Sequence, residues 1–119
     1  MKNIILILFI TLLISYGCSP TLKDTFYWGD YSSTLYNYKK NPDQTTLEVH
    51  KKEILAIIEY ASKSNRKVPP GVYVEYGFLL LKEGKETEGM EYLVKETNLY
   101  PESVVFIERI KKMYSGGAE

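Results

Sequence analysis

The stretch that decides the fold runs from Pro70 to Pro101 and reads PGVYVEYGFLLLKEGKETEGMEYLVKETNLYP. Apolar residues recur at helical spacing in both halves, which predicts one helix over Pro70–Glu83 and a second over Glu86–Leu99. Gly84 lies between them and permits the left-handed backbone of a tight turn. The stretch therefore predicts an antiparallel helical hairpin.

The hairpin resembles a tetratricopeptide unit, a repeat of about 34 residues built from two helices. Counted from Pro70, the residues typical of the repeat fall in place without a gap: Tyr73, Gly77, Gly84, Gly89, Leu93, Leu99 and Pro101. Gly77 and Gly89 are expected to let the two helices approach closely. Gly89 replaces the usual Ala, and Glu96 replaces a small apolar residue. The sequence contains only one clear repeat, so the flanking helices are expected to cap it.

Helical patterns continue toward the N-terminus. A first helix is predicted over Phe26–Lys40, because aromatic and apolar residues share one face there: Trp28, Tyr31, Leu35 and Tyr38. Asp30 or Ser32 is expected to cap this helix. Asn41-Pro42 should end it, because the residue before a proline is pushed out of the helical region.

Two more helices complete the pattern. One is predicted over Asp43–Lys63, where Thr45 or Thr46 can cap it and where the apolar stripe comprises Leu47, Ile54, Leu55, Ile57, Ile58 and Ala61. The last helix starts at Pro101, and its apolar side is expected to hold Phe106, Ile107, Ile110, Met113 and Tyr114. The sequence contains no convincing strand pattern. It predicts an all-α fold of about five helices in antiparallel hairpins.

The N-terminal end of the chain has the features of an export signal. Lys2 gives a basic start, and the run Ile4–Ile14 is apolar except for Thr11. The run is shorter than the roughly 20 residues that cross a bilayer, which is typical of a signal peptide. Residues 1–17 are therefore predicted to be cleaved, and removing 17 of the 119 residues leaves a mature chain of 102.

The end of that signal, Ile14-Ser15-Tyr16-Gly17-Cys18, resembles a bacterial lipobox. Ser15 stands where the lipobox usually has Leu. The resemblance implies a diacylglyceryl group and palmitate on Cys18, and Ser19 after it implies sorting to the outer membrane, with the domain most simply facing the periplasm. The alternative is an ordinary secretory signal followed by a chance cysteine.

This reading divides the chain into four parts. Residues 1–17 are the lipoprotein signal, residues 18–25 a lipidated tether, residues 26–114 the helical tetratricopeptide-like domain, and residues 115–119 a frayed tail. Cys18 is the sole cysteine of the sequence, so no internal disulfide is possible.

Charge and histidine content exclude several classes of function. The chain has 15 Lys and Arg against 15 Asp and Glu, and its basic pairs lie apart, so nucleic-acid binding is not expected. His50, the sole histidine, adjoins Lys51 and Lys52 and is predicted to lie on the surface. Without a group of ligands or a nucleophile and base pair around it, the sequence predicts no metal, no cofactor and no enzymatic activity.

Glu96 is expected to point toward the helix interface of the hairpin, where a carboxylate needs hydrogen-bond partners or a proton. Tyr73, Tyr76 and Tyr92 are candidate donors, and Arg109 is a candidate counter-ion. The favoured interpretation is a polar clasp between helices. A catalytic or ligand-binding acid and a shifted register that leaves Glu96 in water are the alternatives.

The first helix of a tetratricopeptide hairpin lines its concave face. By that register the face should present a partner-binding groove formed by Val74, Glu75, Phe78, Leu81 and Lys82. The alternative is that the long helix Asp43–Lys63 covers these residues.

Several motifs along the mature chain resemble the bacterial lipoprotein family DUF4810. They are Trp28-Gly29-Asp30-Tyr31, Leu35-Tyr36, Pro69–Gly77, Glu96 and Tyr100-Pro101-Glu102-Ser103. The resemblance implies tetratricopeptide-like helices and partners such as a lipoprotein similar to the curli secretion channel subunit, or one of the DUF799 family.

The sequence thus favours a lipid-anchored, non-enzymatic adaptor that binds another envelope protein. Anchoring would raise the effective concentration of a weak binder at the membrane. The alternative function is a module that binds a small ligand or a peptide, such as a cell-wall fragment, in a pocket of Tyr73, Tyr76 and Glu96.

Overall fold

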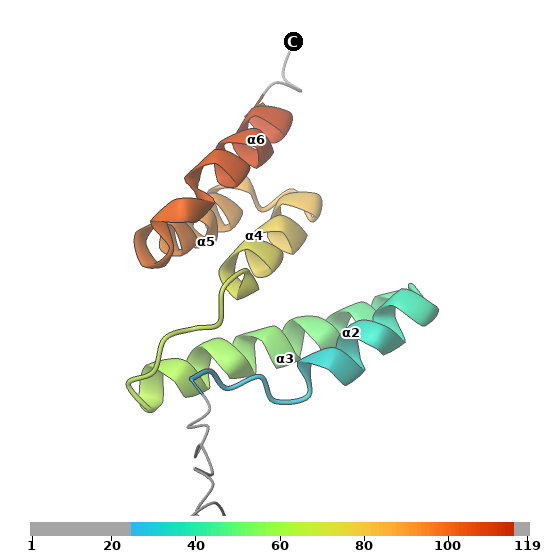
Figure 1. Ribbon diagram of the computed structural model, residues 1–119. Coiled ribbons are helices and arrows are strands. Elements are labelled where there is room, and N and C mark those ends of the chain that lie inside the picture. The colour runs from blue at the N-terminus through green and yellow to red at the C-terminus, as the bar shows by residue number, and fades with distance from the viewer. Residues whose placement is uncertain (1–24, 116–119) are drawn as a thin grey trace, which may run out of the picture.

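A computed structural model describes residues 25–115 of the chain (Figure 1). Its helices are α2 (Tyr31–Lys40), α3 (Gln44–Lys63), α4 (Val72–Lys82), α5 (Glu86–Leu99), the short 3-10 helix η1 (Pro101–Ser103) and α6 (Val104–Ser115). The described part contains five α-helices and no strand, which confirms the all-α prediction. The predicted signal peptide, Cys18 and most of the tether lie outside the described residues.

The helices pack in pairs. Helices α2 and α3 lie side by side, and α4 and α5 form the hairpin predicted from Pro70–Pro101, as Figure 1 shows. Helix α3 also packs against α4, and α6 follows η1 and packs against α5. None of the helices in the described range is both long enough and apolar enough to cross a bilayer.

The start of α2 differs from the prediction. The helix begins at Tyr31 instead of Phe26, because Gly29 has a positive φ of 47° and turns the chain before the first helical residue. Asp30 is the N-cap residue, as expected, but its side chain makes no capping hydrogen bond. Its backbone N–H instead donates to Glu53 Oε1 of α3 at 2.8 Å. The segment before α2 is thus fixed to α3.

The start of α3 has a complete capping box. The Asp43 side chain accepts from the Thr46 backbone N–H at 2.8 Å, and the Asp43 N–H donates to the Thr46 hydroxyl at 3.3 Å. The prediction that a threonine caps this helix is wrong, since Asp43 occupies the N-cap and Thr46 supplies the return bond. The carboxylate accepts the exposed N–H more strongly than a hydroxyl would.

The predicted close approach within the hairpin is confirmed. A Cβ atom built on Gly77 would lie 2.8 Å from the carbonyl oxygen of Gly89, and one built on Gly89 would lie 2.8 Å from that of Gly77. A distance below about 3 Å is shorter than the van der Waals radii of the two atoms allow. Helices α4 and α5 therefore meet backbone to backbone at these glycines. Any side chain at either position would separate them.

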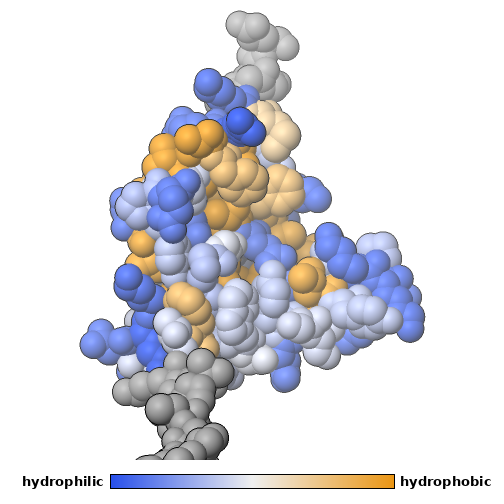
Figure 2. All heavy atoms as spheres, in the orientation of Figure 1, coloured by the Kyte–Doolittle hydropathy of each residue, from blue (hydrophilic) through white to orange (hydrophobic). Residues whose placement is uncertain are grey.

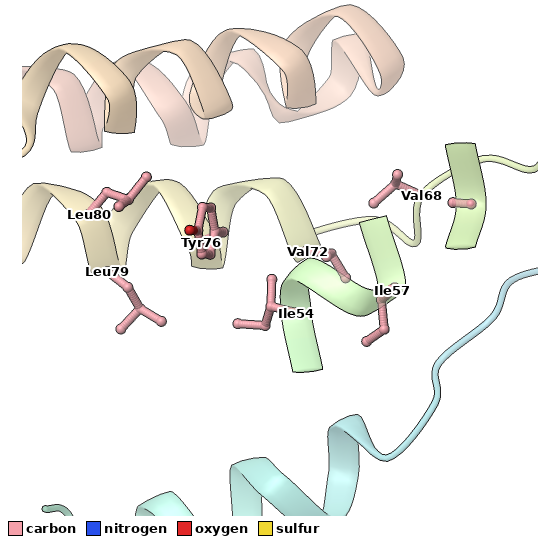
Figure 3. Packing of buried hydrophobic residues seen from close by; sticks show 8 residues of the cluster. Ile54, Ile57, Val68, Val72, Tyr76, Leu79 and Leu80 are labelled. Carbon is pink, nitrogen blue, oxygen red and sulfur yellow. The ribbon is translucent and has the colours of Figure 1, made fainter. Parts of the chain in front are cut away.

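Two clusters of buried side chains hold the helices together. The first joins α3 to α4 and the segment before it, and Figure 3 shows Ile54 and Ile57 of α3 beside Val72 of α4. The second cluster joins α4, α5 and α6 through Val74, Leu81, Leu93, Ile107 and Ile110. Helix α4 therefore contributes to both clusters and is the central element of the fold.

The apolar side of α6 differs in part from the prediction. Ile107 and Ile110 are buried and Tyr114 is half-buried, as expected for the inward face. Phe106 and Met113 are 57% and 62% exposed, although they were predicted to share that face. They lie one position before Ile107 and Tyr114 and so are rotated about 100° to the neighbouring side of the helix.

Candidate functional site

A polar network centred on the buried His50 joins α2, α3 and α4. His50 of α3 is fully buried, and its Nδ1 lies 2.9 Å from the Thr34 hydroxyl of α2. Its Nε2 lies 3.1 Å from Glu75 Oε1 of α4, and the other oxygen of Glu75 accepts from the Tyr31 hydroxyl at 2.5 Å. Four side chains from three helices are thus linked in one chain of hydrogen bonds.

The electrostatics of this network favour a structural role. Burial, and then the hydrogen bond to Glu75, raises the pKa of the Tyr31 hydroxyl well above its ordinary value, so Tyr31 stays protonated and donates. Both ring nitrogens of His50 are occupied, and Tyr31 and Tyr38 flank the ring at centroid distances of 5.3 and 6.2 Å. The imidazole therefore has no free nitrogen to offer a substrate or a metal.

The prediction that His50 is a surface residue is wrong. The adjoining lysines suggested an exposed position, yet His50 lies on the apolar stripe of α3, four positions before Ile54 and three after Leu47. Lys51 is also buried, and its ammonium donates to Glu83 Oε1 at 2.5 Å, which compensates for the loss of water. The helical phase of His50 was the signal that could have placed it inside.

Glu83, at the end of α4, has two basic partners. Its Oε1 bonds Lys51 and its Oε2 lies 3.0 Å from Lys85. The hydrogen bonds from Lys51 and Lys85 lower the pKa of the Glu83 carboxyl. Although burial lowers the pKa of Lys51, the bond and charge of Glu83 raise it above its ordinary value overall. The ion pair of Lys51 with Glu83 joins α3 to the end of α4 and stabilises their packing.

Glu96 is 2% exposed and points from α5 to the first turn of α4. Its Oε1 accepts from the Gly71 backbone N–H at 2.7 Å, whereas Oε2 is buried with no hydrogen-bond partner among the described residues. Burial raises the pKa of the Glu96 carboxyl, and the amides of Gly71, Tyr73 and Val74 only partly offset this. Glu96 thus binds the exposed N–H groups that begin a helix.

The donors to Glu96 are not those expected from the sequence. Tyr73 and Tyr76 pack against Tyr92 at ring distances of 6.1 and 4.7 Å. Burial, and then the charge of Glu96, raises the pKa of Tyr73, but the hydrogen bond to Glu96 comes from the Gly71 backbone instead. The expected counter-ion Arg109 lies exposed on α6. A backbone donor leaves no periodic signal in the sequence, so the pattern could not reveal it.

The five residues predicted to line an open groove do not form one. Val74 and Leu81 are buried in the cluster beneath α6, and Phe78 is half-buried with its ring 5.9 Å from that of Tyr114. Glu75 belongs to the His50 network, and Lys82 is exposed with its ammonium 5.1 Å from the Phe78 ring. The alternative that α3 covers this face is also incomplete, because α6 supplies the residues packed on Val74 and Leu81.

The pocket expected for a small ligand also differs. A hollow of about 290 Å³ beside Tyr73 is lined by Tyr73, Lys95, Asn98 and Leu99. Tyr76 and Glu96 do not line it, because both are buried. The structure thus does not bring the predicted trio of Tyr73, Tyr76 and Glu96 to one open site.

An exposed apolar surface lies on the C-terminal helices. Val105, Phe106 and Met113 of α6 are 66%, 57% and 62% exposed, and Val104 is 43% exposed. Figure 2 shows hydrophobic side chains gathered on the upper half of the molecule, where α6 lies. A shallow groove of about 460 Å³ on α5 is lined by Thr87, Met90, Glu91, Val94 and Lys95. The exposed side of α6 is the candidate interaction site, although Phe106 and Met113 were predicted to share one apolar side with Ile107 and Ile110.

Over residues 25–115, no three His, Cys, Asp or Glu side chains are placed to hold a metal ion. The imidazole at the centre of the polar network is buried, and the exposed side of α6 carries several apolar side chains. The geometry thus defines a small all-α domain of paired helices with an apolar surface on α6.

The comparison with family models places this domain. Residues 25–110 match the model described as a domain of unknown function, DUF4810, and the chain belongs to this family. The resemblance found in the sequence is confirmed to that extent. No curated protein and no solved structure matches the chain.

Proposed function

We propose that the protein is a lipid-anchored lipoprotein of the outer membrane that acts as a non-enzymatic adaptor for another envelope protein. The observation that carries the adaptor role is the exposed apolar side of α6, formed by Val105, Phe106 and Met113. Exposed apolar patches on small soluble domains commonly mark protein interaction sites.

The internal arrangement supports the same role. The hairpin of α4 and α5 has the close backbone contact at Gly77 and Gly89 that a tetratricopeptide-like unit uses, and α6 packs onto it as the next helix of a stack would. In such stacks each added unit buries its apolar side on a neighbour. The outer side of α6 is the next free position, and a partner helix is the chemistry that fits it.

Anchoring and binding act together in this proposal. Lipid on Cys18 confines the domain to the membrane that also carries a lipoprotein partner, such as one similar to the curli secretion channel subunit or to DUF799 proteins. Each buried methylene of an acyl chain contributes about 0.8 kcal/mol, so several chains give a lasting anchor. A modest contact through α6 then suffices, because the effective concentration is high.

In-cell photocrosslinking tests the adaptor role. A photoreactive phenylalanine analogue replaces Phe106 in one variant and Tyr36, which is 63% exposed on α2, in a matched control. We expect a discrete crosslinked product with an envelope lipoprotein from position 106 and none from position 36. Equal products from both positions, or none from 106, would contradict the assignment of α6 as the binding surface.

A further inference from the structure

A cluster of exposed aromatic rings lies where the described chain begins. Tyr27 stacks on Tyr60 of α3 with ring centroids 3.9 Å apart and an interplanar angle of 27°. Trp28 follows and packs against Tyr31 at 5.4 Å. Figure 1 shows this segment, in blue, running beside α3 before it enters α2. One ring stack thus joins the start of the described chain to α3, and the Trp28 ring follows it directly in the sequence.

The segment that carries these rings is firmly held. The Tyr31 N–H donates to the Trp28 carbonyl at 3.0 Å, and the Asp30 N–H donates to Glu53 at 2.8 Å. Gly29 supplies the positive φ of the turn between them. These bonds fix the backbone, so the rings are presented in a defined place.

The rings nevertheless remain open to solvent. Tyr27, Trp28 and Tyr60 are 36%, 42% and 41% exposed. A hollow of about 280 Å³ beside the stacked pair is lined by Tyr27, Ala56, Glu59, Tyr60 and Lys63. Tyr and Trp side chains combine an apolar ring with a polar O–H or N–H group. Half-exposed rings of this kind suit a boundary between an apolar phase and water.

The short chain between Cys18 and these rings indicates that the boundary is the membrane surface. Thr25 is seven positions after Cys18. An extended chain spans at most about 3.5 Å per residue, so a lipid on Cys18 keeps Thr25 within about 25 Å of the bilayer. Tyr27 and Trp28 come two and three positions after Thr25, so a lipid on Cys18 would keep them close to the bilayer.

We propose that Tyr27, Trp28 and Tyr60 form a membrane-contacting surface that rests in the headgroup region of the bilayer to which Cys18 anchors the domain. Trp and Tyr are the side chains enriched at that depth. The inference rests on the proposed lipid anchor. It assigns the anchored domain a fixed orientation, with α6 directed away from the bilayer, because Figure 1 places α6 on the opposite side of the molecule from residues 25–30.

Trp28 is the sole tryptophan of the chain and therefore reports on its own surroundings. The full chain is purified from membranes, the lipid on Cys18 is verified by intact mass, and the protein is reconstituted in vesicles of phosphatidylethanolamine and phosphatidylglycerol. We expect the Trp28 emission to shift to shorter wavelength, and brominated phospholipids labelled near the headgroups to quench it more than those labelled at the acyl ends. Emission that is unshifted and unquenched overturns the proposal.

Matched variants locate the contact. Tyr27→Ser with Tyr60→Ser should reduce the quenching, whereas Phe106→Ser on α6 should leave it unchanged, and circular dichroism verifies that each variant is folded. Equal quenching in wild type, in the double variant and in Phe106→Ser overturns the assignment to these rings. Protection of Trp28 that needs no vesicles and grows with protein concentration also overturns it, because a second copy would then cover the surface.

The lipid anchor is tested separately from the aromatic surface. If the intact mass shows an unmodified Cys18, the natural anchor is refuted. Coupling the free thiol to a maleimide phospholipid then restores an anchor at the same position, since the chain has no other cysteine. Shallow quenching of Trp28 in the coupled protein supports the membrane-contacting surface, and no quenching overturns it.

Discussion

Glu96 is a buried glutamate, and burial raises the pKa of its carboxyl. Burial raises the pKa of this carboxyl more than the hydrogen bond from the Gly71 N–H lowers it, so the folded state holds a proton on it more tightly than the unfolded chain does. A group whose pKa is raised by folding stabilises the fold below its unfolded pKa, and this contribution is lost as the pH rises through the folded pKa.

Two substitutions separate the hydrogen bond of Glu96 from its charge. Glu96→Ala leaves the Gly71 N–H unpaired and should lower the free energy of unfolding by about 1–3 kcal/mol. Glu96→Gln keeps an acceptor without a charge, so its stability relative to wild type should improve between pH 4 and pH 7. Urea unfolding at both pH values measures the two effects. A melting temperature of Glu96→Ala within a degree of wild type would refute the buried-clasp interpretation.

His50 is the second residue whose role can be tested singly. His50→Ala leaves Glu75 and the Thr34 hydroxyl without their shared partner and opens a void, which should lower the free energy of unfolding by about 1–3 kcal/mol. Val49→Ala is the control, since Val49 is the neighbouring residue and is 53% exposed. Thermal melts that give both variants the same small loss would show that the network adds nothing to stability.

At the scale of elements, the tightest constraint is the contact between α4 and α5. Gly77→Ala improves helix propensity by about 1 kcal/mol, yet its Cβ would meet the Gly89 carbonyl oxygen at 2.8 Å. We expect a net loss of stability, because the clash is with backbone and the helices must move apart. Thr87→Ala on the exposed side of α5 is the control and should be neutral or slightly stabilising. A thermal melt of Gly77→Ala at or above wild type would contradict the close packing.

Much of the element pattern could be predicted because helical periodicity and Pro and Gly positions are local signals. The hairpin over residues 70–101, its glycine contact and the break at Asn41-Pro42 follow from such signals. The start of α2 could be predicted in part, since Asp30 is the expected N-cap residue, but the bond from its N–H to Glu53, more than 20 positions away, has no local signal. The helical phase of His50 does signal its burial, but the partner of its ring, Glu75, comes from another helix and leaves no local signal.

The candidate site was harder to predict than the fold. A helical pattern shows which residues share a face, but it does not show which of two apolar faces meets another helix. Ile107 and Ile110 turn inward, so the neighbouring apolar side with Phe106 and Met113 is left exposed. The same inward side of α6, with Ile107 and Ile110, packs on Val74 and Leu81 and so fills the expected groove on α4.

At the scale of the whole molecule, the proposed functions lie on opposite sides of the domain. Tyr27, Trp28 and Tyr60 are exposed at and near the start of the described chain, and α6 lies on the other side of the molecule from residues 25–30. In the proposed arrangement, the aromatic surface would contact the membrane while a partner binds α6 from the other side.

Affinity capture from crosslinked envelopes is the most direct test of an anchored adaptor. The tagged wild-type chain is compared with two variants. Cys18→Ala removes the proposed anchor, and Phe106→Ser makes the exposed side of α6 more polar while the buried Ile107 and Ile110 are kept. We expect wild type to recover a lipoprotein similar to the curli secretion channel subunit or to the DUF799 family, and both variants to lose most of it. Equal recovery by all three chains, or recovery of no envelope lipoprotein by wild type, would contradict the proposed function.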